Sequence, residues 1–409
     1  MVQSAYYRAP ESGAVIVRMR PIILRLKQII DRNLQFLLKA VWACPACKDE
    51  WMARPTPTPT LLEAATAPLH RAARLEDWFH GLRQRWGRSR GLVATVVPFT
   101  GYGSTTWVRV LCRIQLGRPG AAQRTPLVGR RGWRSFTGIQ VAHAEVTIRA
   151  GRATRVVRAD RGGVVDARVE VKLSPGWHDI TITVDDEEPM VAPVFIVDPE
   201  VKFGLVSDID DTVMVTALPR PFLAAWNTFV LNEHGRRPVP GMAVLYERVT
   251  RTHPGAPVIY LSTGAWNVAP TLTRFLERNL YPQGALLLTD WGPTHERWFR
   301  SGKEHKQTSL RRLAEEFPDM SWLLVGDDGQ HDESLYGEFV KEHPQNVAGV
   351  AIRQLSTSEA VLAGGRSKDG PDGTDAVDWY YAPDGAGLSE QLSEAGILPA
   401  GYSDRYKSQ

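Results

Sequence analysis

The sequence predicts an α/β protein: a parallel β-sheet preceded by a β-sandwich-like domain and an N-terminal helical segment. From residue 202 onward, short apolar runs alternate with helical stretches, which is typical of a parallel sheet covered on both faces. Between residues 92 and 199, seven short segments alternate or are rich in β-branched residues, with Gly, Pro and Asp at the breaks, which favours a β-sandwich. The length of 409 residues exceeds one ordinary core, so several domains are expected.

These patterns divide the chain into four regions. Residues 1–90 are a basic helical segment, and 91–200 are the β-sandwich-like domain. Residues 201–360 form the domain of the predicted parallel sheet, with a small insertion at about 214–256 that we expect to form a cap over the sheet edge. Residues 361–409 are polar and Gly-rich, which predicts a loop-rich C-terminal tail.

The N-terminal segment is basic and amphipathic. Residues 1–90 contain 15 Lys and Arg against 7 Asp and Glu, and apolar residues recur at helical spacing within 21–42. Such a helix either packs on its own protein or lies on an anionic membrane surface. The stretch RPTPTPT at 54–60 predicts a stiff linker. Cys44 and Cys47 have a redox or half-zinc spacing, but no second such pair occurs, so we assign them no role.

Composition indicates a soluble globular protein, because 43% of the residues are hydrophobic and 23% are charged. No run of 18 apolar residues occurs, and charged residues interrupt the apolar ones near the start, so neither a membrane span nor a signal peptide is predicted. Three cysteines make a disulfide framework implausible, which fits a reducing compartment. We therefore expect a cytoplasmic protein that is either free or peripheral at a membrane.

Polar residues follow three of the predicted parallel strands where each strand ends. These residues are Asp208, Ser262 and Asp327. Ligands bind at the carboxyl ends of parallel strands, so we expect the three side chains to share one site. A calcium loop of the EF-hand type is disfavoured, because Thr212, Val213 and Pro219 stand where that loop requires an acid, a Gly and a Glu.

The spacing of Asp208 and Asp210 suits phosphoryl transfer. A carboxylate at a strand end can attack phosphorus, and an acid two residues later can protonate the leaving oxygen and then activate water. A hard divalent cation is needed beside these carboxylates, and Mg²⁺ prefers such oxygen ligands. Ser262 can donate to a phosphoryl oxygen, and Lys306 can neutralise the charge of the phosphate and of the nucleophile.

This constellation resembles the haloacid dehalogenase superfamily of phosphohydrolases. Its four motifs match DIDDT, YLST, Lys306 and GDDGQHD. The resemblance implies a haloacid-dehalogenase-like Rossmannoid sheet, with Asp208 as the nucleophile and Asp210 as the general acid and base. It also implies phosphoryl binding by Ser262 and Lys306. Mg²⁺ would be bound by Asp208 and Asp327 together with Asp210, through its carbonyl oxygen.

Longer stretches are similar to the actin-patch-associated phosphatidate phosphatase family and its bacterial relatives over about residues 70–355. They include GYGSTTWVRVLCRIQLGRP, LSTGAWNV, LLLTDWG and VGDDGQHDESLYGEFVKEHP. The family implies release of phosphate from phosphatidate, a phospholipid partner and no nucleic acid. The further site residues implied are Thr263, Gly264, Trp266, Asn267 and His331 for the substrate, and Thr212, Asp328 and Asp332 as support behind the catalytic groups.

Three residues depart from the family pattern, and none is in the nucleophile pair. Ala265 stands where proline is common, Thr289 where arginine is expected, and Asp328 where a small residue is usual. The absent arginine could change which phosphate ester is preferred.

The segment PRPFLAAWNTFVLNEHGRRPVPGM is too long for a bare turn and predicts the cap. Within it, Phe222, Trp226 and Phe229 either face lipid or form a buried helix face.

Two alternatives to a lipid phosphatase stay open. The same chemistry could act on a soluble sugar or nucleotide phosphate, or the chain could be a non-catalytic binding module. The presence of Asp208, Asp210, Lys306 and Asp327 argues against the module.

Overall fold

The described part of the chain covers most of the two predicted β-rich regions. In a computed structural model, the described residues are 81–119, 138–185, 187–215, 237–289, 295–329, 331–357, 359–360 and 376–400, without the side chains of 295–301. All of them belong to one compact unit, Glu76–Gln409. The predictions for the helix at 21–42, the linker at 54–60, Cys44, Cys47, Phe222, Trp226 and Phe229 lie outside the described residues.

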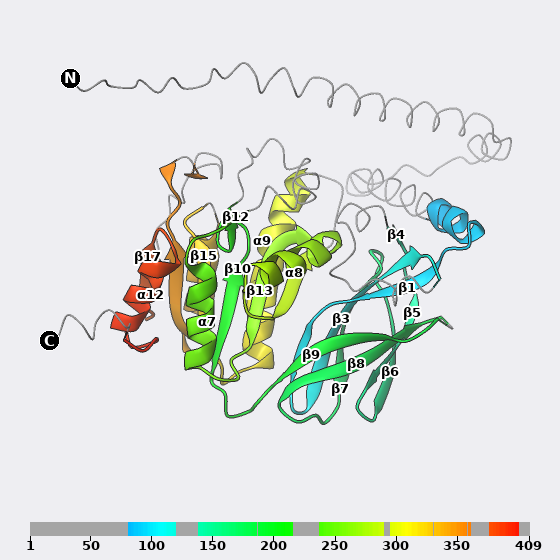
Figure 1. Cartoon of the computed structure of the whole chain (residues 1–409), viewed down its shortest axis with the longest axis horizontal. Coiled ribbons are helices and arrows are strands. Elements are labelled where there is room, and N and C mark those ends of the chain that lie inside the picture. Colours follow the sequence, from blue (N-terminus) through cyan, green and yellow to red (C-terminus); the bar gives the residue numbers. More distant parts are fainter. Residues whose placement is uncertain are drawn as a thin grey trace, which may run out of the picture. The chain divides into compact units, whose positions relative to one another are not determined.

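A six-stranded parallel sheet carries the predicted catalytic residues (Figure 1). Its strand order is β14-β13-β10-β15-β16-β17, and every neighbouring pair is parallel. The strands are β10 (Phe203–Asp208), β13 (Val258–Ala265), β14 (Ala285–Thr289), β15 (Ser321–Asp327), β16 (Val347–Arg353) and β17 (Trp379–Ala382). Most of their residues are buried apolar ones, as expected for strands that are covered on both faces.

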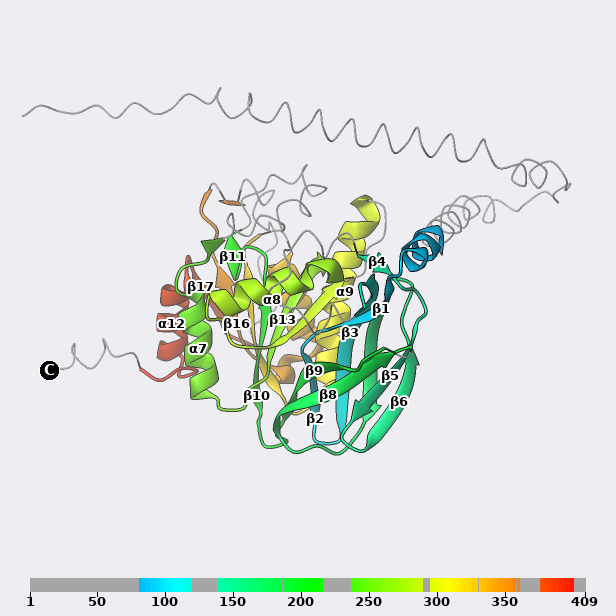
Figure 2. The same cartoon turned by 45° about the vertical axis from the view of Figure 1, so that its right-hand side comes forward.

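Helices cover both faces of this sheet (Figures 1 and 2). They are α7 (Met242–Thr252), α8 (Ala269–Arg278), α9 (His295–Glu316), α10 (Asp332–Glu342) and α12 (Gly385–Glu394). The chain moves from β10 to β13 and β14 in one direction, and then from β14 to β15 and β16 in the other. Because parallel crossovers are right-handed, α7 and α8 lie on one face and α9 and α10 on the other. α12 packs against α7, and α9 packs against α10.

The helix α7 belongs to the body of this domain and not to the cap. Its residues Met242, Leu245, Tyr246 and Val249 are fully buried in the core of the sheet. The expected cap range of about 214–256 was therefore too long at its C-terminal end. Two short strands, β11 (Met214–Val215) and β12 (Arg237–Pro238), pair antiparallel before α7 begins.

The C-terminal region is more regular than expected. Residues 376–400 contain β17, which extends the parallel sheet, and α12, whose Leu388 and Leu392 are fully buried. The expectation of mostly loop was wrong for these residues. The side chain of Asp384 caps α12 by accepting hydrogen bonds from the backbone amides of Ala386 and Gly387, both at 3.0 Å.

Nine strands form the second sheet. They are β1 (Val93–Pro98), β2 (Gly101–Ser104), β3 (Trp107–Gly117), β4 (Ile139–Gln140), β5 (Glu145–Ala150), β6 (Ala153–Arg158), β7 (Val164–Glu170), β8 (Gly176–Val184) and β9 (Met190–Val197). The main path is β1-β3-β2-β9-β8-β5-β6, and both β4 and β7 pair with β3. The sheet is mixed, because β2 and β9 run parallel. Each of the seven segments expected to be extended contains a strand, and β2 is additional.

The C-terminal half of α9 contacts the nine-stranded sheet through a charged cluster, which we call the α9 anchor. It consists of Tyr102, Arg109, Asp166, Arg312 and Glu316. Arg109 of β3 donates to Glu316 from Nε at 3.0 Å and also to Asp166. Arg312 donates to the other oxygen of Asp166 at 2.7 Å, and Tyr102 donates to Glu316 at 2.8 Å. These bonds attach α9 to β2, β3 and β7.

Asp166→Asn is expected to lower the free energy of unfolding by about 1–2 kcal/mol near neutral pH, because two arginines lose their shared carboxylate. Burial alone would raise the pKa of Asp166, but Arg312 and Arg109 hold it below its usual value. A carboxyl group whose pKa is lower in the folded state stabilises the fold fully at pH values above its pKa in the unfolded state, which is about 3.9. This stabilisation is lost as the pH falls through its pKa in the folded state. Urea unfolding at several pH values should therefore show the two proteins converging below about pH 4.

Asp319→Asn is the matched control, because Asp319 forms an exposed pair with Lys202. It should change stability by less than about 1 kcal/mol. An equal loss in both variants, or a difference independent of pH, would contradict the role of the α9 anchor.

Candidate active site

The register of the parallel sheet brings the predicted strand-end residues together. Asp208 pairs with Leu261 of β13, so Ser262 lies one residue further along that strand. Ser207 pairs with Val325 of β15, so Asp327 lies two residues beyond that partner. β10 is the first strand in the chain, and later strands are added on both of its sides. Ligand-binding crevices form where the strand order reverses in this way. Asp208, Ser262 and Asp327 therefore meet at the carboxyl edge, as the sequence predicted.

A tight turn returns the chain over the end of β10. Asp211 adopts a positive φ of 57°, a conformation that Asp tolerates better than most residues. Its backbone amide donates to the carbonyl of Met214 at 2.9 Å. This turn holds Asp210 near the strand end, where its Oδ2 accepts a hydrogen bond from Ser262 Oγ at 3.0 Å. The second acid of the motif thus lies beside the residue that was expected to bind phosphate.

Lys306 of α9 bridges two buried carboxylates. Its Nζ lies 2.6 Å from Oδ1 of Asp208 and 2.7 Å from Oδ1 of Asp332. Burial alone would lower the pKa of this ammonium, but Asp208 and Asp332 raise it above its ordinary value. Lys306 therefore stays protonated at neutral pH and holds one oxygen of Asp208 in a defined position.

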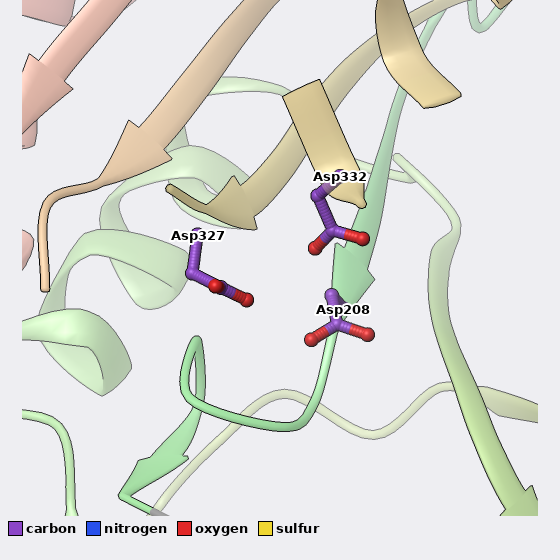
Figure 3. A group of neighbouring side chains, drawn as sticks. All are labelled: Asp208, Asp327 and Asp332. Atoms are coloured by element: carbon purple, nitrogen blue, oxygen red, sulfur yellow. The ribbon is translucent and has the colours of Figure 1, made fainter. Parts of the chain in front are cut away.

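Asp208, Asp327 and Asp332 point toward one another at the edge of the sheet (Figure 3). One oxygen from each lies within 4.8 Å of the other two. Burial raises the pKa of Asp208 and of Asp327, and the neighbouring Asp332 adds to this effect. Oδ2 of Asp332 is buried and has no hydrogen-bond partner among the described residues. A divalent cation would offset this crowding of negative charge, so the three residues fit a hard metal ion with oxygen ligands.

Asp332 has two contacts at the site. It was expected to support Lys306 and the metal from behind, and its bond to Lys306 fits that expectation. Its carboxylate also belongs to the acidic cluster. The carboxylate of Asp210 is not part of the cluster and bonds to Ser262 instead. This arrangement leaves Asp210 available for proton transfer.

The residues of β13 that follow Ser262 are held by the side chains of Ser262 and Thr289. The amide of Gly264 donates to Ser262 Oγ at 3.0 Å. Thr289 donates from Oγ1 to the carbonyls of Thr263, at 2.8 Å, and Gly264, at 3.2 Å. Thr289 stands where the family pattern led us to expect arginine, and here it fixes the backbone of the site.

Trp266 has a packing role. Its ring is 5% exposed and stacks on Phe99 of the loop after β1, with ring centroids 4.9 Å apart. The expectation that Trp266 contacts substrate is therefore not supported by its position. The neighbouring Asn267 is half-buried, and its Oδ1 is buried without a hydrogen-bond partner among the described residues.

The remaining residues expected at the site are Asp328 and Thr212, as support, and His331, for the substrate. Asp328 ties two loops together, because its Oδ1 accepts from the amide of Leu355 at 2.8 Å. Thr212 is fully buried, and its hydroxyl has no partner among the described residues. His331 is exposed just before α10.

Arg353 is a site residue that our sequence interpretation missed. It ends β16 at the same edge of the sheet and is 5% exposed. Its Nη1 donates to the carbonyl of Asp211 at 2.6 Å, and its Nη2 bonds to Glu359 at 2.8 Å. Arg353 thereby holds the turn that carries Asp210. A polar residue at the end of VAGVAIR was the signal, the same one that marked Asp208 and Asp327.

Arg353→Met is expected to lower kcat about tenfold or more, because the turn that carries Asp210 loses a charge-assisted hydrogen bond. Glu359→Gln is the control, since it removes the ion pair but leaves the bond to the carbonyl of Asp211. Steady-state kinetics should show a much smaller effect for Glu359→Gln. If both variants lost activity equally, Arg353 would act through its ion pair and not through the turn.

Two comparisons bear on the chemistry of this site. Residues 203–354 match the family described as phosphatidate phosphatase APP1, catalytic domain. The match contains Asp208, Asp210, Ser262, Lys306 and Asp327 and supports a phosphatase-like hydrolase. It starts at the first strand of the parallel sheet, so the nine-stranded sheet lies outside it.

The curated relatives are distant and much longer than the matched region. Phosphatidate phosphatase APP1 of Saccharomyces cerevisiae is 25% identical over 158 residues, which are 38% of this chain and 26% of the yeast protein. An uncharacterised protein of Schizosaccharomyces pombe is 24% identical over 153 residues, which are 37% of this chain and 25% of that protein. The similarity thus spans about a quarter of each relative.

Among solved structures, a carbohydrate acetylesterase from Xanthomonas citri aligns at 11% identity with a TM-score of 0.25, over 74% of this chain and 76% of that one. That score is too low to indicate a shared fold.

Proposed function

We propose that this protein is a Mg²⁺-dependent phosphatase with a haloacid-dehalogenase-like catalytic domain, that Asp208 is its nucleophile, and that phosphatidate is its substrate. The observation that supports the chemistry best is the pairing at the strand edge: Lys306 binds one oxygen of Asp208, while Ser262 bonds to Asp210. The two acids of the motif thus have different partners. Asp208 is held beside a cation, and Asp210 is held by a neutral hydroxyl.

In the first half of the reaction, an oxygen of Asp208 attacks phosphorus, and the bond from phosphorus to the ester oxygen breaks. The leaving oxygen takes the proton of the Asp210 carboxyl, so the alcohol leaves neutral. Asp208 becomes an aspartyl phosphate. Lys306 and Ser262 are placed to stabilise the charge that develops on the phosphoryl oxygens, after Ser262 exchanges its bond to Asp210 for one to phosphate.

In the second half, Asp210 is a carboxylate and removes a proton from water. The resulting oxygen attacks the aspartyl phosphate, which releases inorganic phosphate and restores Asp208. The proton stays on Asp210, so the site is ready for another turnover. The same residue acts first as the acid and then as the base.

Mg²⁺ would be held by Asp208, Asp327 and Asp332, and its chemical contribution is to neutralise charge on the transferring phosphoryl group. The fit rests on the buried, all-oxygen donor set and on the buried Asp332 oxygen that lacks a protein partner.

Phosphatidate is proposed because the family match over residues 203–354 carries that substrate in its description, as does the yeast relative. No helix among the described residues is long and apolar enough to cross a membrane. We propose that the protein reaches this lipid substrate by contact with the membrane surface, as the basic amphipathic pattern of residues 21–42 suggests.

The test is phosphate release by the full chain from phosphatidate in mixed micelles and from a panel of soluble sugar and nucleotide phosphates. We expect turnover of phosphatidate, its loss on chelation of Mg²⁺, and recovery when Mg²⁺ is restored. Turnover of the soluble panel alone would contradict the lipid substrate and leave the mechanism standing. Turnover that survives chelation would contradict the metal requirement.

A further inference from the structure

Two buried tyrosines are bonded to the segment that carries both acids of the motif. Tyr246 is on α7, and Tyr281 follows the C-terminal end of α8. Their rings meet edge to face, with centroids 5.5 Å apart and an angle of 76° between the ring planes. We call these two residues the tyrosine pair. Because both are buried, their influence on the reaction has to pass through the residues that they hold.

Tyr281 holds the turn that carries Asp210. Its hydroxyl donates to the carbonyl oxygen of Val213 at 2.9 Å, and this bond is buried. The same carbonyl accepts a second hydrogen bond, from the amide of Val239 at 3.0 Å. Val213 closes the turn, because its own amide donates to the carbonyl of Ile209 at 3.0 Å. Tyr281 therefore fixes the end of the turn that is remote from β10.

The turn connects this bond to Asp210. Asp210 forms a backbone bridge with Met214, the residue after Val213. Arg353 holds the middle of the turn through the carbonyl of Asp211. Since backbone bonds join the two ends of the turn, a shift of the Val213 carbonyl would move the carboxyl group of Asp210.

Tyr246 holds the strand end that carries Asp208. The hydroxyl of Ser207 donates to the carbonyl of Asp208 at 2.6 Å, and it also forms a hydrogen bond with the hydroxyl of Tyr246. A serine hydroxyl has only one hydrogen, so Tyr246 is the donor in the second bond. The ring of Tyr281 thus packs on a residue that is bonded to the strand end of the nucleophile.

We propose that Tyr281 is a positioning residue for Asp210. Its hydroxyl fixes the turn of the acid, and its ring rests on Tyr246, so the acid keeps a defined position relative to Asp208. This role depends on the proposed phosphatase reaction, in which Asp210 must reach the leaving oxygen while Asp208 attacks phosphorus. In such a reaction, a displacement of about 1 Å can lower the rate about a hundredfold.

Tyr281→Phe removes the hydroxyl and keeps the ring on Tyr246. The quantity to compare is kcat/KM, which includes the step that releases the alcohol. For short-chain phosphatidate we expect kcat/KM to fall about tenfold, because an alkoxide leaves only with a proton from Asp210. For p-nitrophenyl phosphate, whose leaving group is stable without a proton, the loss should be below about threefold. A loss of packing alone would lower both values by the same factor, and that result would overturn the proposal.

Tyr260→Phe is the matched control. Tyr260 is fully buried, and its hydroxyl donates to the carbonyl of Pro282 at 2.8 Å. This is the same kind of bond as that of Tyr281, but it does not reach the turn. We expect the control to change kcat/KM by less than about threefold, equally for both esters, because Asp210 keeps its position. An unequal loss in the control as large as that of Tyr281→Phe would also overturn the proposal.

Hydrogen exchange tests the contact without a substrate. The amides of Val213 and Met214 both donate to the carbonyl of Ile209, so they report on opening of the turn. In Tyr281→Phe they should exchange at least about fivefold faster than in the wild type, and in Tyr260→Phe at the wild-type rate. Unchanged exchange in Tyr281→Phe would overturn the proposal whatever the activity. Failure of the wild type to release phosphate from any ester would contradict the proposed function instead, and the exchange rates would still decide whether Tyr281 holds the turn.

Discussion

Asp208→Asn is expected to reduce phosphate release by at least about a thousandfold, because an amide cannot form the covalent intermediate. Asn has nearly the shape of Asp, and Lys306 keeps its second partner, Asp332, so the fold should survive. Asp210→Asn should cause a comparable loss, since the leaving oxygen then has no proton donor. The measurement is Mg²⁺-dependent phosphate release, with circular dichroism to confirm folding.

Asp211→Asn is the matched control, one residue beyond Asp210. Asn tolerates the positive φ at this position, and the bond to Arg353 uses the backbone carbonyl, which is unchanged. We expect this variant to keep most of the activity. Equal activity in Asp208→Asn and the wild type would eliminate the proposed nucleophile, and equal losses in all three variants would indicate a general charge effect.

Lys306→Met is expected to abolish activity and to lower the free energy of unfolding by about 3–5 kcal/mol. Removing one partner of a buried ion pair leaves uncompensated charge, and here two carboxylates lose their shared cation. The loss of stability should shrink when Mg²⁺ is added, because a bound cation replaces part of the missing charge. Urea unfolding with and without Mg²⁺ measures both effects.

Lys303→Met provides the comparison on the same helix. Lys303 pairs with Glu338, and both side chains are more than one third exposed. Its removal should change stability by less than about 1 kcal/mol and leave activity unchanged. Similar destabilisation by the two variants would mean that helix propensity, and not the buried triad, explains the loss at Lys306.

Much of the candidate site was predictable because it follows from the geometry of parallel strands. Carboxyl ends of such strands share one edge, so Asp208, Ser262 and Asp327 could be placed together from three apolar runs and the residues that end them. Lys306 was found through its motif, and the structure places it between Asp208 and Asp332. Arg353 is also a polar residue at the end of a parallel strand, but our sequence interpretation missed it. Arginine at a strand end is usually expected to be exposed to solvent.

The other errors have local causes. The helix at Met242–Thr252 was assigned to the cap because sequence distance between the motifs cannot tell an insertion from a crossover helix. The strand at Trp379–Ala382 was hidden by its Gly-rich and acidic neighbours, and only its pairing with β16 makes it regular. Trp266 was expected to contact the substrate, but its ring stacks on Phe99, which lies 167 residues earlier in the chain, and it packs in the core.

The sequence by itself predicted phosphatase-like chemistry, because its acids, hydroxyl and lysine occur in an order and spacing that suit phosphoryl transfer at the ends of successive strands. Only the tertiary structure decided which of these groups contact one another. Asp332 joins the acidic cluster and Asp210 does not, because α10 starts beside β15 while the turn after β10 directs Asp210 toward Ser262. The structure also brings Asp166 of β7 beside Leu287 of β14 and His305 of α9 around one cavity, although these residues are more than a hundred positions apart in the chain. Such contacts depend on how two sheets pack, and no local pattern in the chain encodes them.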